Sequence, residues 1–225
     1  MAMLSSIYGD SLSTFEGMNP PGHIVYYNID NRMRHSLMEV SETWWGRVLN
    51  EFGWELLVNA SYSGSRVSGS GFPSACSYER MGFLQNERTP DIILVYLGYN
   101  DFGFCVPLKS ENSENDPMCF YDAYCLMLKR LKEKYPNSRV ICGTVMQNYI
   151  FYRPDISERL EKNRDGTPLS AYNEAIKAAC VTEKVECADL HGTGIRCDSL
   201  SDSHCTGRGH KEMAEAWIKE LKRIL

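Results

Sequence analysis

The residues best able to carry chemistry in this sequence are a serine near its start and a histidine near its end. Ser11 follows an apolar run in IYGDSL, and His204 lies in SDSHCTGRGH. A serine hydroxyl attacks a carbonyl carbon once a neighbouring imidazole takes its proton, so this pair of residue types is suited to acyl transfer. Taken alone, each has an ordinary interpretation, because Ser11 could cap a helix and His204 could be a solvated loop residue. The fold must bring the two together.

Short apolar runs alternate with helical patterns along the chain, which is typical of an open α/β sheet. The runs are mostly β-branched or apolar on both faces, as buried parallel strands are. Helical spacing occurs in residues 121–131, 172–180 and 213–225, and ETWWGRVLNEFG predicts a helix that closes on Gly53. The five predicted strands are LSSIY (4–8), WELLVNA (54–60), DIILVYL (91–97), RVICGTVM (139–146) and VECADL (185–190).

Three of the predicted strands end in clusters of polar and small residues. The clusters are GDS (9–11), NASYSG (59–64) and LGYND (97–101). In parallel sheets with right-handed crossovers the carboxyl ends of the strands share one edge, and ligands bind there. We therefore expect the three clusters to lie on that edge. The loop with His204 precedes the last helix and can reach the same edge.

These four blocks, in this order, resemble those of the SGNH hydrolases, also called the GDSL family of esterases and lipases. Gly-Asp-Ser-Leu matches the first block, so the resemblance makes Ser11 the nucleophile. The second and third blocks imply an oxyanion hole formed by the backbone N–H groups of Ser11 and Gly64 and the side-chain amide of Asn100. His204 and Gly209 match the fourth block, so His204 would be the base. The resemblance implies a hydrolase of ester bonds that works through an acyl-enzyme.

The acid of the triad is where the sequence departs from the family pattern. The family has D-x-x-H, but the residue three before His204 is Ser201, with Asp202 one residue late and Asp198 three residues early. We predict that Asp202 is the acid, because it needs the smaller distortion of the loop. The alternatives are Asp198 or a site with no acid, in which the imidazole still acts as a base but is less well oriented.

The resemblance also implies a single-domain, three-layer α/β/α sandwich around a five-stranded parallel sheet of flavodoxin-like type, with residues 1–225 forming one hydrolase domain. A chain of 225 residues with 43% hydrophobic residues fits one such domain. The G-x-S-x-G elbow of other hydrolases is absent because Ser13 stands where glycine is needed, and no nucleotide-binding glycine motif occurs. The competing interpretation is a binding module that keeps the pocket but has lost turnover.

Composition narrows the classes of function further. The chain has 24 basic and 29 acidic residues, a formal net charge of −5 and no dense basic segment, so we expect no nucleic-acid partner. No apolar run predicts a membrane span and no secretory signal is evident, so a cytoplasmic location is expected. The nine cysteines lack zinc-type spacing and predict buried, reduced thiols. None of His23, His35 and His191 has a metal-ligating partner at useful spacing, so neither metal nor other cofactor is expected.

Two further features have structural interpretations. Trp44 and Trp45 are expected to pack their helix onto the sheet rather than to form a platform for a sugar. His210 falls in the first turn of the final helix, where we expect it on the surface.

The substrate is the feature that the sequence determines least. The segment between the nucleophile and the first clear helix is long for a simple connection, so we expect it to fold over the site. Its Tyr26 and Tyr27, with Tyr99 of the third block, are the predicted substrate-binding residues. Tyr26, Tyr27, Asn28 and Arg32, with the loop NYIFYRPD (148–155) after the fourth strand, would form an aromatic and polar rim, which suits sugars. We therefore expect a small ester, such as O-acetyl groups on a carbohydrate, with lysophospholipids or thioesters as the alternative.

Overall fold

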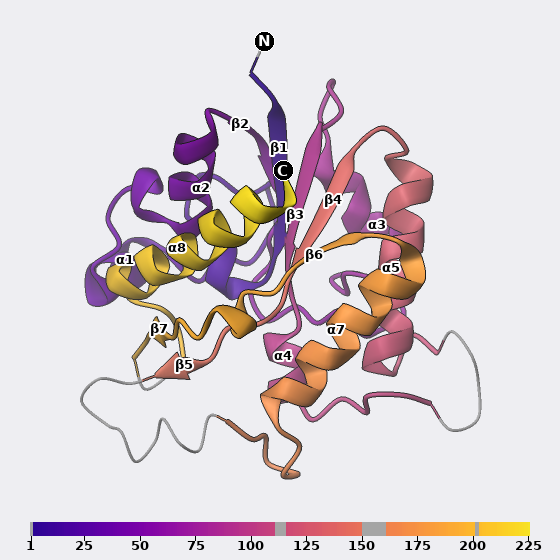
Figure 1. The fold of residues 1–225 in the computed structure, drawn as a ribbon. Coiled ribbons are helices and arrows are strands. Elements are labelled where there is room, and N and C mark those ends of the chain that lie inside the picture. Colours follow the sequence, from indigo (N-terminus) through magenta and orange to yellow (C-terminus); the bar gives the residue numbers. More distant parts are fainter. Residues whose placement is uncertain (1, 111–115, 150–160, 201–202) are drawn as a thin grey trace.

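A sheet of five parallel strands forms the centre of the molecule (Figure 1), in the order β2-β1-β3-β4-β6. The structure is a computed structural model that describes residues 2–110, 116–149, 161–200 and 203–225. Each strand coincides with an apolar run found in the sequence, so the predicted sheet is confirmed. The strands are β1 (Leu4–Gly9), β2 (Glu55–Asn59), β3 (Ile92–Tyr96), β4 (Arg139–Gly143) and β6 (Glu186–Ala188).

The strand order creates a switch point at the carboxyl end of β1. The chain runs from β1 out to the edge strand β2, returns past β1 to β3, and then continues through β4 to β6. Gly9 at the end of β1 pairs with Tyr96 at the end of β3. In doubly wound sheets ligands bind where the direction of winding reverses. Ser11 follows β1 at this point.

Helices cover both faces of the sheet and complete three layers (Figure 1). Side chains alternate along the central strand β3, because Ile92, Leu94 and Tyr96 pack on one face while Ile93 and Val95 pack on the other. The first face is covered by α2 (Trp44–Phe52) and α8 (Gly207–Ile224), and the second by α5 (Phe120–Lys134) and α7 (Leu169–Glu183). The predicted α/β/α sandwich is confirmed.

Helix α2 has the ends that its sequence predicts. It starts after Thr43, whose hydroxyl accepts the N–H of Gly46, and it stops at Gly53 in the left-handed conformation with φ 64°. Both tryptophans at its start are buried. The indole N–H of Trp44 donates to Ser13 Oγ at 3.1 Å, and that of Trp45 donates to the Ser13 carbonyl at 3.0 Å. The tryptophans therefore pack the helix against the turn that follows β1.

Shorter elements connect this framework, and several of them position the site. Strands β5 (Asn148–Tyr149) and β7 (Cys197–Asp198) form a separate parallel pair. The short helices and turns have too few residues to show a clear hydrophobic period, so the sequence did not predict them. The others are α1 (Ile29–His35), α3 (Tyr78–Met81), α4 (Tyr99–Gly103) and the 3₁₀ turns η1 (Ser11–Ser13), η2 (Val40–Glu42), η3 (Gly82–Leu84) and η4 (His191–Thr193).

The cysteines are all free thiols, as the sequence indicated, and only Cys105 and Cys187 are partly exposed. Across the described ranges of the chain, no helix combines the length and the apolar character that crossing a membrane requires.

Candidate active site

Ser11 is held at the start of the tight turn η1, directly after β1. The carboxylate of Asp10 caps this turn by accepting the N–H of Leu12 at 3.0 Å. The turn packs so closely on the strand that a Cβ on Gly9 would lie 2.3 Å from Ser13 Oγ, which explains the glycine there. Ser11 exposes only 7% of its surface.

The structure brings Ser11 and His204 together from opposite ends of the chain. His204 Nε2 lies 3.0 Å from Ser11 Oγ. This distance is that of a hydrogen bond through which a neutral imidazole accepts the hydroxyl proton. The arrangement is the one that a serine nucleophile and its base require.

The predicted oxyanion donors lie on turns that adjoin Ser11. Gly64 has φ +76°, and the second block is tied to β1 because the N–H of Tyr62 donates to the Gly9 carbonyl at 3.1 Å. Asn100 donates one amide hydrogen to the carbonyl of Ser65 at 2.8 Å, which leaves its second N–H for another acceptor. Within the described part of the chain, the backbone N–H groups of Ser11 and Gly64 have no acceptor.

Asp101 fixes the loop that follows the second block, a role that the sequence did not reveal. Its buried carboxylate accepts the backbone N–H groups of Val67 at 2.8 Å and Ser68 at 3.0 Å. Burial raises the pKa of this carboxyl, and the two backbone donors oppose that rise. The residue next to Asn100 thus holds the loop that follows Gly64. The only sequence signal was its place in LGYND, where a turn interpretation fits equally well.

A buried arginine lies beneath the nucleophile turn and was also missed. Arg80 donates to the carbonyls of Gly9 and Pro73 and its guanidinium lies 4.8 Å from the centre of the Tyr8 ring. Burial raises the pKa of Asp10 to about 7, although the charge of Arg80 acts against this rise. Burial lowers the pKa of Arg80 itself. No local pattern marks an arginine that makes its contacts across the fold.

The described residues next to His204 are anchored by β5. The N–H of Leu200 donates to the His204 carbonyl at 3.0 Å, and Ser203 adopts a left-handed conformation with φ 67°. The side chain of Asn148 in β5 donates to the Ser203 carbonyl at 2.8 Å. Ser199 and Cys205 form an antiparallel bridge at the base of the turn.

The predicted acid, Asp202, lies outside the described residues, as does Ser201. The alternative, Asp198, is in β7, where its carboxylate accepts the hydroxyl of Thr206 at 2.6 Å. Thr206 in turn caps α8, because its side chain accepts the N–H of Gly209. The contact seen for Asp198 is therefore one that secures the start of the last helix.

The three tyrosines predicted to bind substrate have different surroundings. Tyr27 is completely buried and its hydroxyl donates to the Cys205 carbonyl at 2.8 Å, so it supports the His204 loop from inside. Tyr26 is partly buried and its ring lies flat on the His204 imidazole, with centroids 3.4 Å apart and planes 5° apart. Tyr99 is partly buried, and burial raises the pKa of its hydroxyl, which Ser203 contacts.

The polar residues expected on the rim have partners within the protein. Asn28 caps α1 by accepting the N–H of Asn31 at 3.0 Å. The guanidinium of Arg32 lies 4.2 Å from the centre of the Phe15 ring and donates to the Met38 carbonyl. Both side chains therefore hold the segment in place in this structure.

The prediction that His210 lies on the surface is wrong. Its side chain is completely buried, and Nδ1 accepts the backbone N–H of Trp44 at 3.1 Å. The first turn of α8 packs against the start of α2, so position 210 faces the interior. Burial lowers the pKa of this imidazole to about 3, so it is neutral near pH 7.

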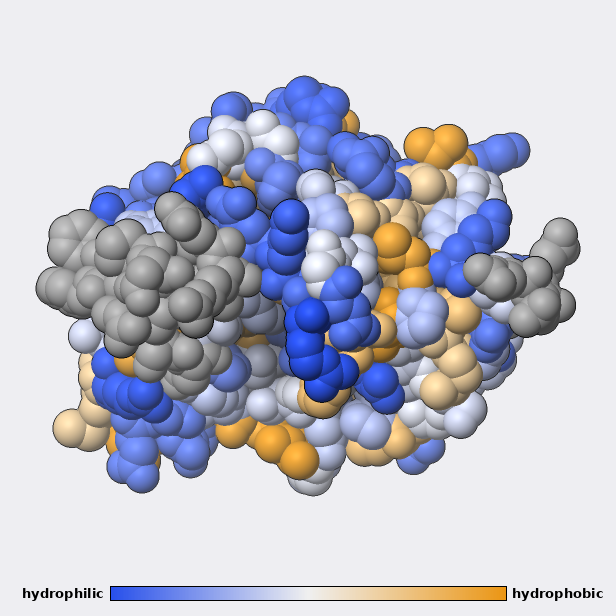
Figure 2. Space-filling model, turned by 90° about the horizontal axis from the view of Figure 1, so that it is seen from below, coloured by the Kyte–Doolittle hydropathy of each residue, from blue (hydrophilic) through white to orange (hydrophobic). Residues whose placement is uncertain are grey.

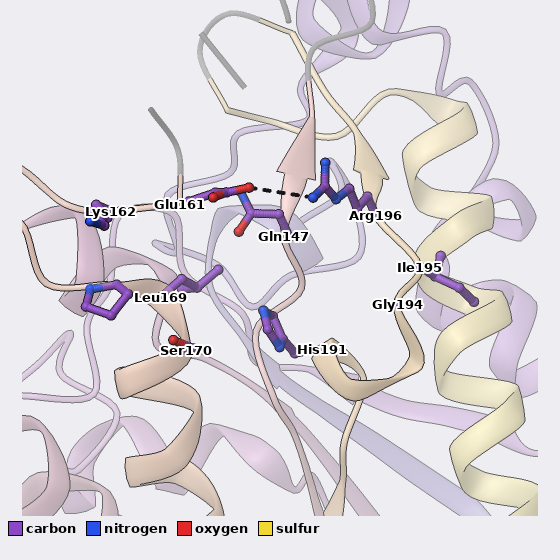
Figure 3. Close-up of a pocket in the computed structure, with 10 residues that line it drawn as sticks. Gln147, Glu161, Lys162, Leu169, Ser170, His191, Gly194, Ile195 and Arg196 are labelled. Atoms are coloured by element: carbon purple, nitrogen blue, oxygen red, sulfur yellow. Dashed lines mark ion pairs between the residues drawn. The ribbon is translucent and has the colours of Figure 1, made fainter. Parts of the chain in front are cut away.

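A pocket of about 400 Å³, drawn in Figure 3, lies beyond the carboxyl ends of β4 and β6. Gln147 after β4, His191 after β6 and Ser170 at the start of α7 contribute to its lining. Glu161 and Arg196 form an ion pair of 3.5 Å across it. Ser11, Gly64, Asn100 and His204 are not among the lining residues, so this pocket does not contain the candidate site.

The chain belongs to the family of GDSL-like lipases and acylhydrolases, whose family model matches residues 3–161. It is therefore a hydrolase of ester bonds. This confirms the family that the four blocks resembled, and it favours an enzyme over the binding module. A search of curated proteins finds no match.

Solved structures of similar fold cover the whole chain or nearly all of it. A structure from Bacteroides ovatus described as a GDSL-like lipase is 26% identical, with a TM-score of 0.76 and 100% of both chains covered. One from Bacteroides uniformis, described likewise, is 26% identical, with a TM-score of 0.74 and coverage of 99% of this chain and 96% of the other. The aryl esterase of M. smegmatis shares the fold at 14% identity, with a TM-score of 0.62 and 100% coverage of both chains.

In the parts of the chain that the structure describes, no three His, Cys, Asp or Glu side chains are grouped so as to hold a metal ion.

Proposed function

We propose that this acylhydrolase is a serine esterase for small acyl groups, with Ser11 as the nucleophile and His204 as the general base. The observation that carries the proposal is the 3.0 Å contact between Ser11 Oγ and His204 Nε2 at the switch point of the sheet. Membership of the GDSL-like family supports the same assignment. The turns with Gly64 and Asn100 supply the hydrogen-bond donors that a tetrahedral intermediate needs.

In the proposed mechanism His204 Nε2 takes the hydroxyl proton while Ser11 Oγ bonds to the ester carbonyl carbon. The carbonyl oxygen becomes an oxyanion, which accepts hydrogen bonds from the N–H groups of Ser11 and Gly64 and from the Asn100 amide. The imidazolium then gives its proton to the leaving alcohol, and an acyl-enzyme remains. Water attacks this acyl group with His204 again as base, which releases the acid and restores Ser11.

We further propose O-acetyl groups on a carbohydrate as the substrate class. Polar side chains of the third block and of β5 support it, because Tyr99 is partly buried there and the Asn148 amide donates to the Ser203 carbonyl at 2.8 Å. Hydroxyl and amide groups of this kind suit the alcohol part of a sugar ester. The middle of the face at the carboxyl ends of the strands is largely hydrophilic (Figure 2).

The second candidate is hydrolysis of long-chain esters such as lysophospholipids or of thioesters. One observation favours it, since hydrophobic surface gathers on the same face, to the right of the centre in Figure 2. Phe104 and Met118, which are 65% and 54% exposed, show that large apolar side chains remain uncovered near the end of α4 and the start of α5.

The catalytic assignment is tested with p-nitrophenyl acetate. Ser11→Ala and His204→Ala should each reduce kcat by about 10⁴-fold or more, because the two residues act as one unit. Ser170→Ala, an exposed serine at the start of α7, is the matched control and should behave as wild type. Unchanged turnover in Ser11→Ala would overturn the proposal, and a wild-type chain with no turnover would favour a binding module.

The substrate is tested by acyl chain length. p-Nitrophenyl esters from acetate to palmitate, followed by an acetylated monosaccharide, separate the two candidates. We expect kcat/KM to be highest for acetate and to fall with every added pair of carbons, and acetate to be released from the sugar. A maximum at eight carbons or longer would support the long-chain alternative.

A further inference from the structure

The ring of Tyr26 covers one face of the His204 imidazole. The ring centroids are 3.4 Å apart and the planes differ by 5°, so the two rings overlap face to face. We propose that Tyr26 is a positioning residue for His204, which holds the imidazole in the plane where Nε2 meets Ser11, rather than a residue that binds substrate. This inference rests on the proposed roles of Ser11 and His204.

The hydroxyl of Tyr26 is fixed by a second histidine. It lies 2.9 Å from His35 Nε2, and His35 Nδ1 lies 3.2 Å from the Cys205 carbonyl. A carbonyl only accepts hydrogen bonds, so His35 Nδ1 carries a proton, and Nε2 is the ring nitrogen that pairs with the Tyr26 hydroxyl. His35 is completely buried, and the hydroxyl of Tyr27 donates to the same Cys205 carbonyl. The residue that follows His204 is thus bound to the segment that supplies the stacked ring.

The backbone of Tyr26 is tied to the nucleophile turn. Its N–H donates to the hydroxyl oxygen of Thr14 at 3.0 Å, and that hydroxyl donates to the Ser11 carbonyl at 2.9 Å. Through Thr14, Tyr26 is linked to Ser11, and through its ring and hydroxyl it is linked to His204 and Cys205. One residue therefore connects both halves of the catalytic pair.

This geometry suits the step at which His204 gains a proton. Rotation of an imidazole about its ring bond has only broad minima, so a flat neighbour restricts it more than a point contact does. An aromatic face also attracts the cation that forms when the imidazole takes the Ser11 proton. Both effects require the ring of Tyr26 more than its hydroxyl.

The test compares Tyr26→Leu, which removes the ring, with Tyr26→Phe, which removes one oxygen. With p-nitrophenyl acetate, Tyr26→Leu should lower kcat by about 10- to 100-fold with KM within about twofold, as expected when a catalytic group is misplaced. It should slow the reaction of Ser11 with a small fluorophosphonate by a similar factor. Tyr26→Phe should stay within about fivefold of wild type. Tyr78→Leu, an exposed tyrosine of α3, is the matched control.

A double-mutant cycle separates positioning from substrate binding. If Tyr26 acts only through His204, Tyr26→Leu should cause no further loss in the His204→Ala background. A raised KM, or a loss that persists in that background, would show that Tyr26 binds substrate and would overturn the inference. So would a loss in Tyr26→Phe as large as that in Tyr26→Leu. If Tyr26→Leu is too unstable to purify, Tyr26→Met replaces it in the cycle.

The outcome also distinguishes this inference from the proposed function. If Ser11→Ala and His204→Ala abolish turnover but Tyr26→Leu reacts like wild type, only the positioning role fails. If Ser11→Ala retains full turnover, both the proposed function and the positioning role of Tyr26 are wrong.

Discussion

The two halves of the candidate site are held in different ways. On the nucleophile side, Ser11, Gly64 and Asn100 lie in the segments that follow β1, β2 and β3, and the sheet itself places these segments at one edge. On the histidine side, His204 lies in a turn between β7 and α8, beyond the edge of the main sheet. Its position depends on contacts with residues 26–35 and with β5.

The difference is one of sequence separation and redundancy. Asp10 and Asp101 bind backbone groups of turns at the same sheet edge, and buried Arg80 donates to the carbonyls of Gly9 in β1 and Ala60 after β2, so several bonds support this side of the site. The Cys205 carbonyl is instead held by two side chains about 170 residues away, Tyr27 and His35. A site can thus combine a rigid nucleophile with a base whose orientation rests on a few long-range contacts.

The largest change in kcat that would test this comparison is expected for the acid on the histidine side. We predict that Asp202→Asn lowers kcat by about 10⁴-fold, because an imidazole without its carboxylate partner loses orientation and stabilisation of its cation. Ser11 should still react slowly with a fluorophosphonate, since the base itself remains. Steady-state kinetics and the rate of labelling provide both measurements.

Asp198→Asn is the matched variant, and it should change kcat little because the carboxylate of Asp198 is engaged by Thr206. If the two variants behave the other way round, the acid is Asp198. If neither matters, Ser11 and His204 work as a dyad, and the acid prediction is wrong.

The difference between the nucleophile side and the histidine side also determines how much of the site the sequence could predict. The clusters that contain Ser11, Gly64 and Asn100 are found from strand ends and a shared edge, and the family resemblance then singles out these three residues. The structure puts their turns together. The stacking of Tyr26 on His204 and the burial of Tyr27 and His210 depend on which segments pack together after folding. Local periodicity carries no information on such pairs, so Tyr27 was predicted at a substrate rim and His210 at the surface.

On the nucleophile side, Asn100→Ala should lower kcat by about 10²- to 10³-fold, since the amide acts on charge that develops in the transition state. The lost bond to the Ser65 carbonyl should cost only about 1 kcal/mol of stability. Kinetics with p-nitrophenyl acetate and urea unfolding check the two effects. Asn50→Ala, an exposed asparagine on α2, is the control, and an unchanged kcat in Asn100→Ala would remove the third donor from the proposed oxyanion hole.

The buried carboxyl of Asp10 should make the nucleophile side sensitive to pH. Burial raises its pKa from 3.8 to about 7, so between these values the folded chain holds a proton that the unfolded chain releases. Stability contributed by this group is therefore present below pH 4 and is lost as the pH rises through 7. Asp10→Asn keeps the acceptor for Leu12 and does not titrate. The free energy of unfolding of this variant, relative to that of the wild type, should therefore rise by on the order of 2 kcal/mol from pH 5 to pH 8. Urea unfolding at the two pH values measures this gain, and an equal difference at both would contradict the pKa assigned here.

The smallest expected effect compares two helix caps, one on each side of the site. Thr43 caps α2 and Thr206 caps α8, and each accepts the N–H of the glycine three residues later. Thr43→Val and Thr206→Val should each lower the free energy of unfolding by about 1 to 2 kcal/mol.

The two variants should differ in kcat. Thr206→Val also frees the carboxylate of Asp198 next to the His204 turn, so we expect kcat to fall by about two- to fivefold through a small displacement of the imidazole. Thr43→Val should leave kcat unchanged, because β1, Asp10 and Arg80 still hold the nucleophile turn. Thermal unfolding and kcat measured on the same preparations separate the two effects. An equal loss of kcat in both variants would mean that the two sides of the site are coupled through the helices, and that the nucleophile is less independently supported than its hydrogen bonds indicate.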